Sequence, residues 1–167
     1  MKRYIAVFLF LFVTSASFAS SWSYSKEVDE MADKLITYAR LGSDNSLNLP
    51  FPYSGTNHGE LMVRKHPKYG ISVIVSIDKG QLLCPSYTGC SVQVRFGDAP
   101  PVSFQASPPA DGRSDHVFLQ GQQRFIAQAK KVRKIMVQMN IYQAGAPVLE
   151  FNSPDPLVWG TKAITIK

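Results

Sequence analysis

The two cysteines of the chain, Cys84 and Cys90, are its most specific chemical feature. They lie in the stretch GQLLCPSYTGCSVQVRF with five residues between them. A metal site needs about four ligands at short spacings, and the histidines, His58, His66 and His116, are scattered. A thioredoxin-like pair has two intervening residues and a βαβ setting, which are both missing here. We therefore predict a structural disulfide that straps a hairpin, with a catalytic or metal role as the alternative. No metal or cofactor is expected.

Ser114, Asp115 and His116 place the residue types of a hydrolytic triad side by side in the stretch RSDHVF. Neighbours in an extended chain point to opposite faces, so we do not expect these residues to form the hydrogen-bonded relay of a triad. The sequence also has no GxSxG, HExxH, P-loop or GxGxxG motif. We assign no catalytic residue and favour a protein that is not an enzyme. The alternative is a hydrolase of an envelope polymer, with a site assembled from distant residues.

Four carboxylates cluster early in the chain, at Glu27, Asp29, Glu30 and Asp33. A helix start favours negative charge because of the helix dipole. We therefore expect these side chains in a solvated first helical turn rather than in the acid pair of a glycosidase.

Two groups of residues are candidates for binding. An aromatic residue on a rigid loop is a good anchor for a partner, although such a residue can equally plug the open end of a sandwich, which is the reading we favour here. A basic cluster can contact an anionic polymer or lipid headgroups, although the end of a solvated helix is the simpler explanation. The candidates are Phe51 and Tyr53 in NLPFPYSG, and Lys130, Lys131, Arg133 and Lys134 in AKKVRK.

The first residues have the features of a secretory signal peptide. Lys2 and Arg3 precede a continuous apolar run at 4–13, and small residues follow in TSASFAS. The run of ten is shorter than the roughly 20 residues that a membrane-spanning helix needs, so an uncleaved anchor is the weaker alternative. We predict a signal peptide at 1–19 and a single domain at 20–167, with no transmembrane segment in the mature chain. The protein is then periplasmic or secreted, where cysteine pairs become disulfides.

Charge gives little indication of a partner. The chain has 18 basic and 12 acidic residues and a net charge of +6; without Lys2 and Arg3 the balance is 16 against 12, or +4. No aromatic residues interleave the basic cluster at 130–134, as a nucleic-acid stacking surface requires. We expect no nucleic acid among the partners.

Apolar and polar residues alternate with a period of two in much of the chain, which is typical of strands with one buried face. The clearest runs are 70–78, 91–96 and 134–142; shorter candidates are 60–65, 101–106, 116–120, 147–152 and 163–167. One amphipathic helix is expected at about 121–132. The conformation of 26–41 is ambiguous between helix and strand. The number of strands predicts a mainly β fold, a two-layer antiparallel β-sandwich with one helix packed on it.

One hairpin is predicted in detail. Residues 134–142 and 147–152 pair through the turn QAGAP, because Gly145 permits a positive φ and Pro147 suits the first position of a strand. The residues expected to face the core are Ile135, Val137, Met139, Ile141, Leu149 and Phe151.

The order of several short motifs resembles a widespread group of small, mostly uncharacterised exported proteins of Gram-negative bacteria and their mobile elements. The motifs are WSYS (22–25), DEM (29–31), FPYSG (51–55), GQLLC (80–84), CSVQVRF (90–96), RFIAQAKKVRKI (124–135), IYQAG (141–145), LEFN (149–152) and LVW (157–159). The group is more distantly similar to the VasI-like accessory proteins of type VI secretion. The resemblance implies a β-rich periplasmic or secreted fold, adds no catalytic residue and favours an extended 33–41. The tail TKAITIK departs from the pattern.

These observations together indicate an exported, non-enzymatic protein that binds another component of the cell envelope, either a protein or a polymer. An accessory role in a secretion or conjugation system is the alternative that follows from the resemblance.

Overall fold

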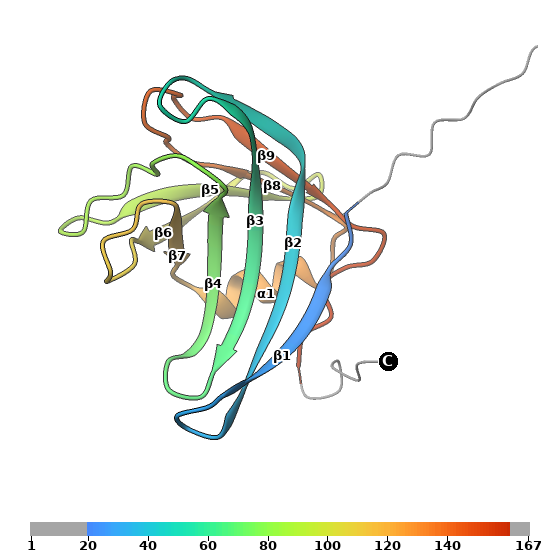
Figure 1. Cartoon of the computed structure of the whole chain (residues 1–167). Coiled ribbons are helices and arrows are strands. Elements are labelled where there is room, and N and C mark those ends of the chain that lie inside the picture. The colour runs from blue at the N-terminus through green and yellow to red at the C-terminus, as the bar shows by residue number, and fades with distance from the viewer. Residues whose placement is uncertain (1–19, 161–167) are drawn as a thin grey trace, which may run out of the picture.

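Alternating apolar residues build one continuous antiparallel sheet. The computed structural model of the protein describes residues 20–160. Its nine strands have the order β1-β2-β3-β4-β7-β6-β5-β8-β9 (Figure 1). The elements are β1 Ser23–Asp29, β2 Lys34–Leu49, β3 Gly55–His66, β4 Gly70–Ile77, β5 Cys90–Phe96, β6 Val102–Ser107, β7 His116–Leu119, α1 Gln122–Ala129, β8 Lys134–Gln138 and β9 Val148–Asn152.

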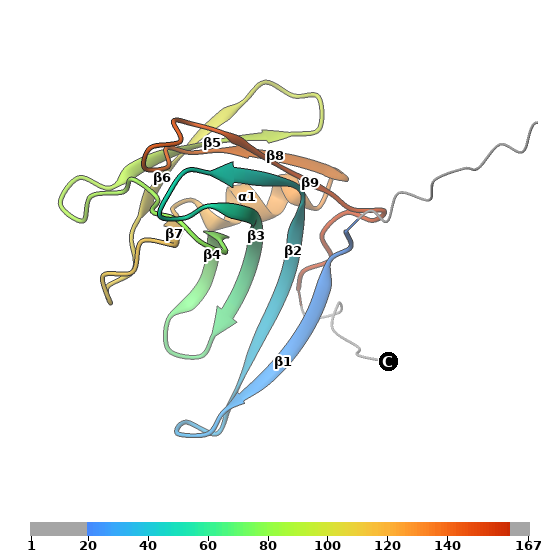
Figure 2. The same ribbon diagram turned by 45° about the horizontal axis from the view of Figure 1, so that its top comes forward.

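The sheet curls strongly, so that its β5–β8–β9 part crosses the β1–β4 part at a steep angle (Figures 1 and 2). The inner faces of both parts and one side of α1 enclose a single apolar core. Phe125 of α1 packs edge-to-face against Phe96 of β5 and Phe104 of β6, with ring centroids 5.3 and 5.9 Å away. The helix therefore closes the core between the two parts of the sheet.

Side-chain hydrogen bonds, rather than a ladder of backbone hydrogen bonds, join β2 to β9 where the curled sheet brings them together. At a register shift in β2, the side-chain amide of Asn45 donates to the carbonyl of Val148 and accepts from the N–H of Glu150, both at 2.8 Å. Asp44 accepts from the backbone N–H of Asn152 at 2.6 Å. The amide of Asn45 thus pairs with β9 as a peptide group of a neighbouring strand would. The sheet is curled but not closed.

Gly59 permits the close approach that the curl needs. A Cβ atom at this position of β3 would collide with the Cδ1 atom of Leu149 from β9. The absence of a side chain lets the two strands pack directly on each other.

The predicted mainly β fold is confirmed, but the structure does not show a two-layer sandwich. All nine strands of the described residues are hydrogen-bonded in one sheet. Alternation along a strand reports which residues are buried, but it does not report how strands are connected between layers. The sharp curl depends on a local bulge and on Gly59, which alternation does not reveal.

The ambiguous segment 26–41 is extended and contributes the hairpin of β1 and β2. The expected helical turn for its carboxylates is therefore wrong. Glu27 and Asp29 belong to β1, while Glu30 and Asp33 lie in the β1–β2 turn, where Asp33 has a φ of 50°. Pairing with β3 on the far side of β2 outweighs the helix propensity of this segment.

The predicted helix at 121–132 is confirmed with a shorter length, Gln122–Ala129. At the end of the helix, the N–H of Leu157 donates a hydrogen bond to the carbonyl of Ala129 at 3.2 Å. The chain turns after Ala129 and begins β8 at Lys134. Phe125 and Ala129 are buried in the core.

The predicted hairpin of β8 and β9 is confirmed in register, and its six core residues are all buried. Gly145 has a φ of 66°. The strand is shorter than 134–142, because β8 ends at Gln138, and Ile141 instead forms isolated bridges with Leu82 and Gly145. The predicted signal peptide at 1–19 and the strand candidate at 163–167 lie outside the described residues. Within 20–160, no helix has the length and apolar character to cross a membrane.

Candidate functional site

Four connecting segments meet on one side of the sheet, at the upper left of Figure 1. These are residues 50–54, 78–89, 108–115 and 139–147, which we call the loop end. Its central segment runs from Gln81 to Cys84. The N–H of Leu82 donates to the carbonyl of Ser114 at 2.7 Å, and the N–H of Tyr142 donates to the carbonyl of Gln81 at 2.9 Å. Backbone hydrogen bonds therefore tie three of the four segments, 78–89, 108–115 and 139–147, to one another.

A buried asparagine fixes the backbone just before the central segment. Asn57 of β3 is fully buried. Its side-chain carbonyl accepts from the N–H of Lys79 at 3.2 Å, and its side-chain N–H donates to the carbonyl of the same residue. The asparagine thus provides hydrogen-bond partners for backbone groups of the chain where it leaves the sheet after β4. Asn57 was not singled out in the sequence, where its alternation with Leu61 and Val63 along β3 is the signal that it faces inward.

The predicted disulfide between Cys84 and Cys90 is present, with 4.8 Å between the Cα atoms. The predicted hairpin setting needs correction, because Cys84 lies in a loop and only Cys90 begins a strand. Gly89 completes the turn with a φ of 69°, and a Cβ atom here would lie 2.6 Å from the carbonyl oxygen of Ala106. The disulfide therefore fastens the loop 85–89 to the end of β5.

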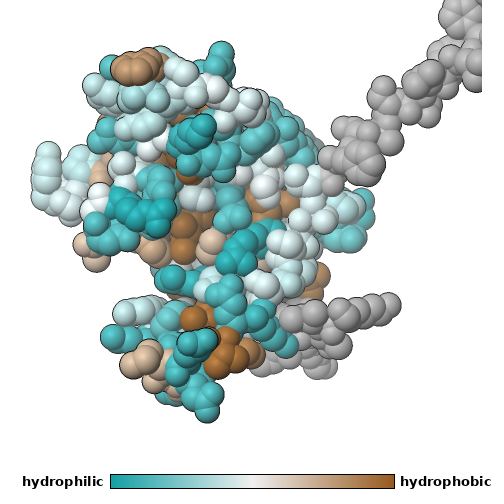
Figure 3. All heavy atoms as spheres, viewed as in Figure 1, coloured by the Kyte–Doolittle hydropathy of each residue, from teal (hydrophilic) through white to brown (hydrophobic). Residues whose placement is uncertain are grey.

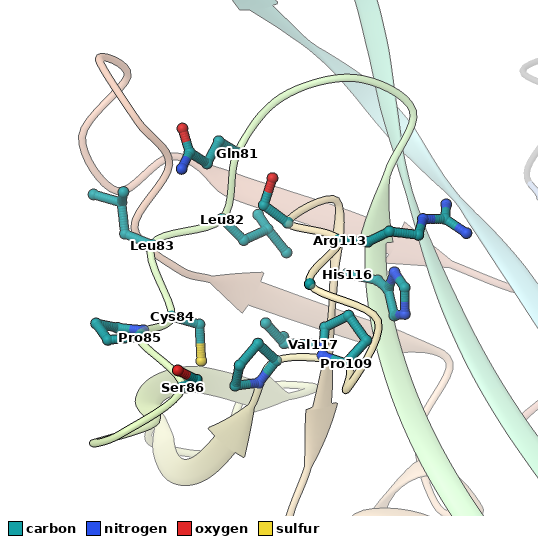
Figure 4. A pocket seen from close by; sticks show the side chains of 13 residues that line it. Gln81, Leu82, Leu83, Cys84, Pro85, Ser86, Pro109, Arg113, His116 and Val117 are labelled. Carbon is teal, nitrogen blue, oxygen red and sulfur yellow. The ribbon is translucent and has the colours of Figure 1, made fainter.

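The disulfide loop and the β6–β7 loop form the walls of a hollow of about 350 Å³ (Figure 4). Prolines form much of both walls, and Leu82, Leu83 and Val117 add apolar surface. In Figure 4, Cys84, Pro85, Pro109 and Val117 lie around the hollow, whereas Arg113 and His116 lie on its β4 side. The hollow is shallow, mainly apolar and bordered by polar groups on one side.

Asp115 joins two of these polar groups. Its carboxylate accepts from the guanidinium of Arg113 and lies 2.6 Å from Nδ1 of His116. Burial acts to raise the pKa of Asp115, but hydrogen bonds from Arg113 and His116 outweigh it and lower the pKa below its ordinary value. The opposite orientation of neighbours, which we expected to prevent a relay of all three residues, does not hold for Asp115 and His116. Asp115 precedes β7, which begins at His116, so the alternation of a strand does not apply to this pair.

The Asp115–His116 pair is two parts of a hydrolytic relay without the third. A general base acts on a nucleophile within hydrogen-bond reach, and within residues 20–160 the imidazole of His116 has no hydroxyl among its hydrogen-bond partners. Ser114 lines the hollow, and its carbonyl holds Leu82. The pair orients an imidazole beside the hollow, but it activates no serine in this arrangement.

Large apolar side chains project from the loop end. Phe51 is 84% exposed and Tyr87 is 87% exposed, while Leu83 and Tyr142 are about half as exposed. Figure 3 shows the apolar surface of the β2–β3 loop at the top of the molecule, within mainly hydrophilic surroundings. The favoured role of a plug is wrong for Phe51, which projects into solvent, and fits Tyr53, which packs against the core.

The basic candidates do not form one surface. Lys134 of β8 pairs with Glu150 of β9 at 2.9 Å. Lys131 and Arg133 are exposed, and Lys130 lines a cleft between α1 and the β1–β4 part of the sheet. Proximity in the sequence did not predict this division, because β8 begins at Lys134 and redirects the chain.

Within 20–160, no group of histidine, cysteine and carboxylate side chains is arranged to hold a metal ion. No family model, curated protein sequence or solved structure matches the chain.

Proposed function

We propose that the protein is an exported, non-enzymatic binding protein that contacts another protein of the cell envelope through its loop end. The apolar run at 4–13 supports export, and the Cys84–Cys90 disulfide fits an oxidising compartment. The resemblance to VasI-like accessory proteins supports a place in a secretion or conjugation assembly as the setting.

The observation that carries the proposal is the order of the loop end. Loops normally lose conformational freedom when they bind, and this loss weakens affinity. Here, a hydrogen bond to the carbonyl of Ser114 and the disulfide already hold the central segment, and Asn57 holds the backbone just before it. Exposed aromatic anchors beside a preformed hollow are the typical centre of a protein interface. A rigid surface that exposes Phe51, Leu83 and Tyr87 therefore favours a protein partner.

Photo-crosslinking tests the proposal. A benzophenone amino acid replaces Tyr87 in the full chain, expressed in its natural host, and the periplasm is irradiated. We expect one discrete cross-linked product, which Phe51→Ala weakens severalfold. Tyr69→Ala is the matched control, because Tyr69 is 63% exposed but lies on the β3–β4 turn. Diffuse labelling, or a product that both variants reduce equally, would contradict the proposal. The mass of the mature chain tests cleavage after Ala19 in the same material.

A second candidate function is hydrolysis of an envelope polymer, and the Asp115–His116 pair beside the hollow is the observation that favours it. This function requires a nucleophilic water or substrate hydroxyl to reach His116. We expect release of soluble fragments from isolated envelope polymers by the purified protein, and loss of this release in His116→Gln. If the wild type releases none, the hydrolase candidate is rejected while the binding proposal stands.

A further inference from the structure

A cleft on the far side of the molecule from the loop end gathers three lysines. Lys26, Thr37, Lys65 and Ile71 are register partners across β1, β2, β3 and β4, so they form one row on the inner face of the sheet. Gln123, Ile126 and Lys130 of α1 also line the cleft, and Trp159 and Gly160 complete it. Its volume is about 500 Å³, which lies within the usual range for small-molecule sites.

The charge of this lysine cleft is strongly one-sided. No carboxylate of the described residues lines it, and within 20–160 neither Lys65 nor Lys130 has an acidic partner within salt-bridge distance. Like charges gathered in one cleft repel one another. An anion in the cleft would relieve this repulsion and would accept charge-assisted hydrogen bonds from the ammonium groups.

Beyond the lysine row, the same face of the sheet becomes apolar. Val28 of β1 and Leu35 of β2 are register partners and lie two residues along from Lys26 and Thr37. They therefore share the inner face. They are 58% and 50% exposed. A ligand that fits both parts has an anionic head and a hydrocarbon tail.

We propose that the lysine cleft binds one molecule of a single-chain anionic amphiphile, with its acidic head between Lys65 and Lys130 and its tail along Val28 and Leu35. Trp159 is 9% exposed and borders the cleft. The N–H of Val158 donates to the hydroxyl of Tyr24 at 2.9 Å and fixes this segment beside β1. The tryptophan therefore reports on occupation of the cleft. This site is separate from the loop end and does not depend on the proposed function.

The test titrates the purified full chain with dodecyl phosphate below its micelle concentration, by calorimetry and tryptophan fluorescence. The full chain is used because residues 161–167 follow directly on Gly160. We expect saturable binding of one molecule, with inorganic phosphate and dodecanol each at least about tenfold weaker. Lys65→Gln and Lys130→Gln each reduce the affinity about tenfold, the typical value for one charge-assisted hydrogen bond.

Lys131→Gln is the matched control, because Lys131 is exposed next to Lys130 but does not line the cleft. It leaves the affinity unchanged, and circular dichroism shows that all three lysine variants are folded. Leu35→Ser lowers the affinity for dodecyl phosphate about threefold, because an apolar contact with its tail is lost, and leaves the affinity for butyl phosphate unchanged. Equal binding by Lys65→Gln and Lys131→Gln would overturn the site. Equal binding of dodecanol or of inorganic phosphate would overturn its assignment to an anionic amphiphile.

Discussion

The strands have the same pattern of alternating residues along their length, but the connections at their two ends differ. At the loop end, three of the four connections are long and hydrogen-bonded to one another, and Asn57 and a disulfide fasten the one at 78–89. At the other end, which we call the hairpin end, the turns 30–33 and 67–69 are short, and β1 and β2 run past α1 with Val28 and Leu35 uncovered. Specific polar contacts and the disulfide hold the loops at the loop end, whereas at the hairpin end the inner face of the sheet is left uncovered.

This difference is the basis on which two separate binding activities are proposed. A rigid end with exposed aromatics suits a protein partner, since little order remains to be gained on binding. An open inner face with lysines beside apolar residues suits a small amphiphilic ligand. Variants that damage one end and preserve the other therefore separate the two proposed activities.

The largest expected effect removes the core on which both ends depend. Val137 of β8 is fully buried between β5 and β9. Val137→Asp places an unpaired charge in an apolar layer, which costs several kcal/mol out of a typical total of about 5–15 kcal/mol. We expect no soluble accumulation of this variant, measured by immunoblot of the periplasm. Gln138→Asp is the control, because Gln138 is exposed and loses only a hydrogen bond to the carbonyl of Ala146. If Val137→Asp accumulates and melts like the wild type, the assigned core face of β8 is wrong.

The next effect is confined to the loop end. Asn57→Ala removes both hydrogen bonds between this buried side chain and the backbone of Lys79, which costs up to about 3 kcal/mol. Urea unfolding measures this loss, and hydrogen exchange localises it: amides of 79–84 lose protection, while those of β1 keep theirs. Asn48→Ala, at an exposed position of β2, should leave both measurements unchanged. Equal loss of protection at both ends would show that the two regions are not independent.

The sequence predicted the strands well and their assembly less well. Alternation placed Val73, Val75, Val92 and Val94 in the core correctly, because burial of one strand face is a local property. The curl of the sheet depends on Gly59 and on Asn45, whose partners lie in β9, about a hundred residues away in the chain. No local pattern reports such contacts.

The candidate site was predicted only in parts. The disulfide was predictable because the spacing of the two cysteines and the scattered histidines argue against a thioredoxin-like pair and a metal site. The contact of Asp115 with His116 was missed because it depends on where β7 begins. The lysine cleft was missed because Lys26, Lys65 and Lys130 are far apart in the sequence and meet only through strand register and the position of α1.

Removing the disulfide of the loop end is expected to lower the free energy of unfolding by a smaller amount. Replacing both Cys84 and Cys90 with alanine frees the loop 85–89 in the unfolded state, and the chain-entropy estimate for such a short loop is about 2 kcal/mol. We expect this loss in urea unfolding, together with weaker photo-crosslinking at Tyr87 and unchanged dodecyl phosphate binding. Alkylation of the denatured wild type from periplasm should detect no free thiol. Two alkylated cysteines in that material would show that the disulfide is not formed there.

The smallest expected effect concerns Glu60, on the outer face of β3. Burial raises the pKa of this carboxyl, and the nearby charge of Asp78 raises it further, against an opposing effect of Arg40. A raised folded pKa means that the folded state holds the proton more tightly than the unfolded chain. The associated stability is present in acid and is lost as the pH rises from the ordinary value of 4.5 through the folded pKa. Glu60→Gln carries no charge and avoids this loss.

We therefore expect Glu60→Gln to be more stable than the wild type at pH 7, by less than about 1 kcal/mol, and to match it at pH 3.5, where the carboxyl is protonated in both states. Urea unfolding at the two pH values measures the difference. Glu30→Gln, on the exposed β1–β2 turn, is the control at the hairpin end and should change little at either pH. A Glu60→Gln variant less stable than the wild type at pH 7 would mean that the attraction of Arg40 exceeds the cost of burial. The outer face of β3 would then stabilise the fold through an ion pair, and this part of the sheet would resemble the loop end in depending on specific polar contacts.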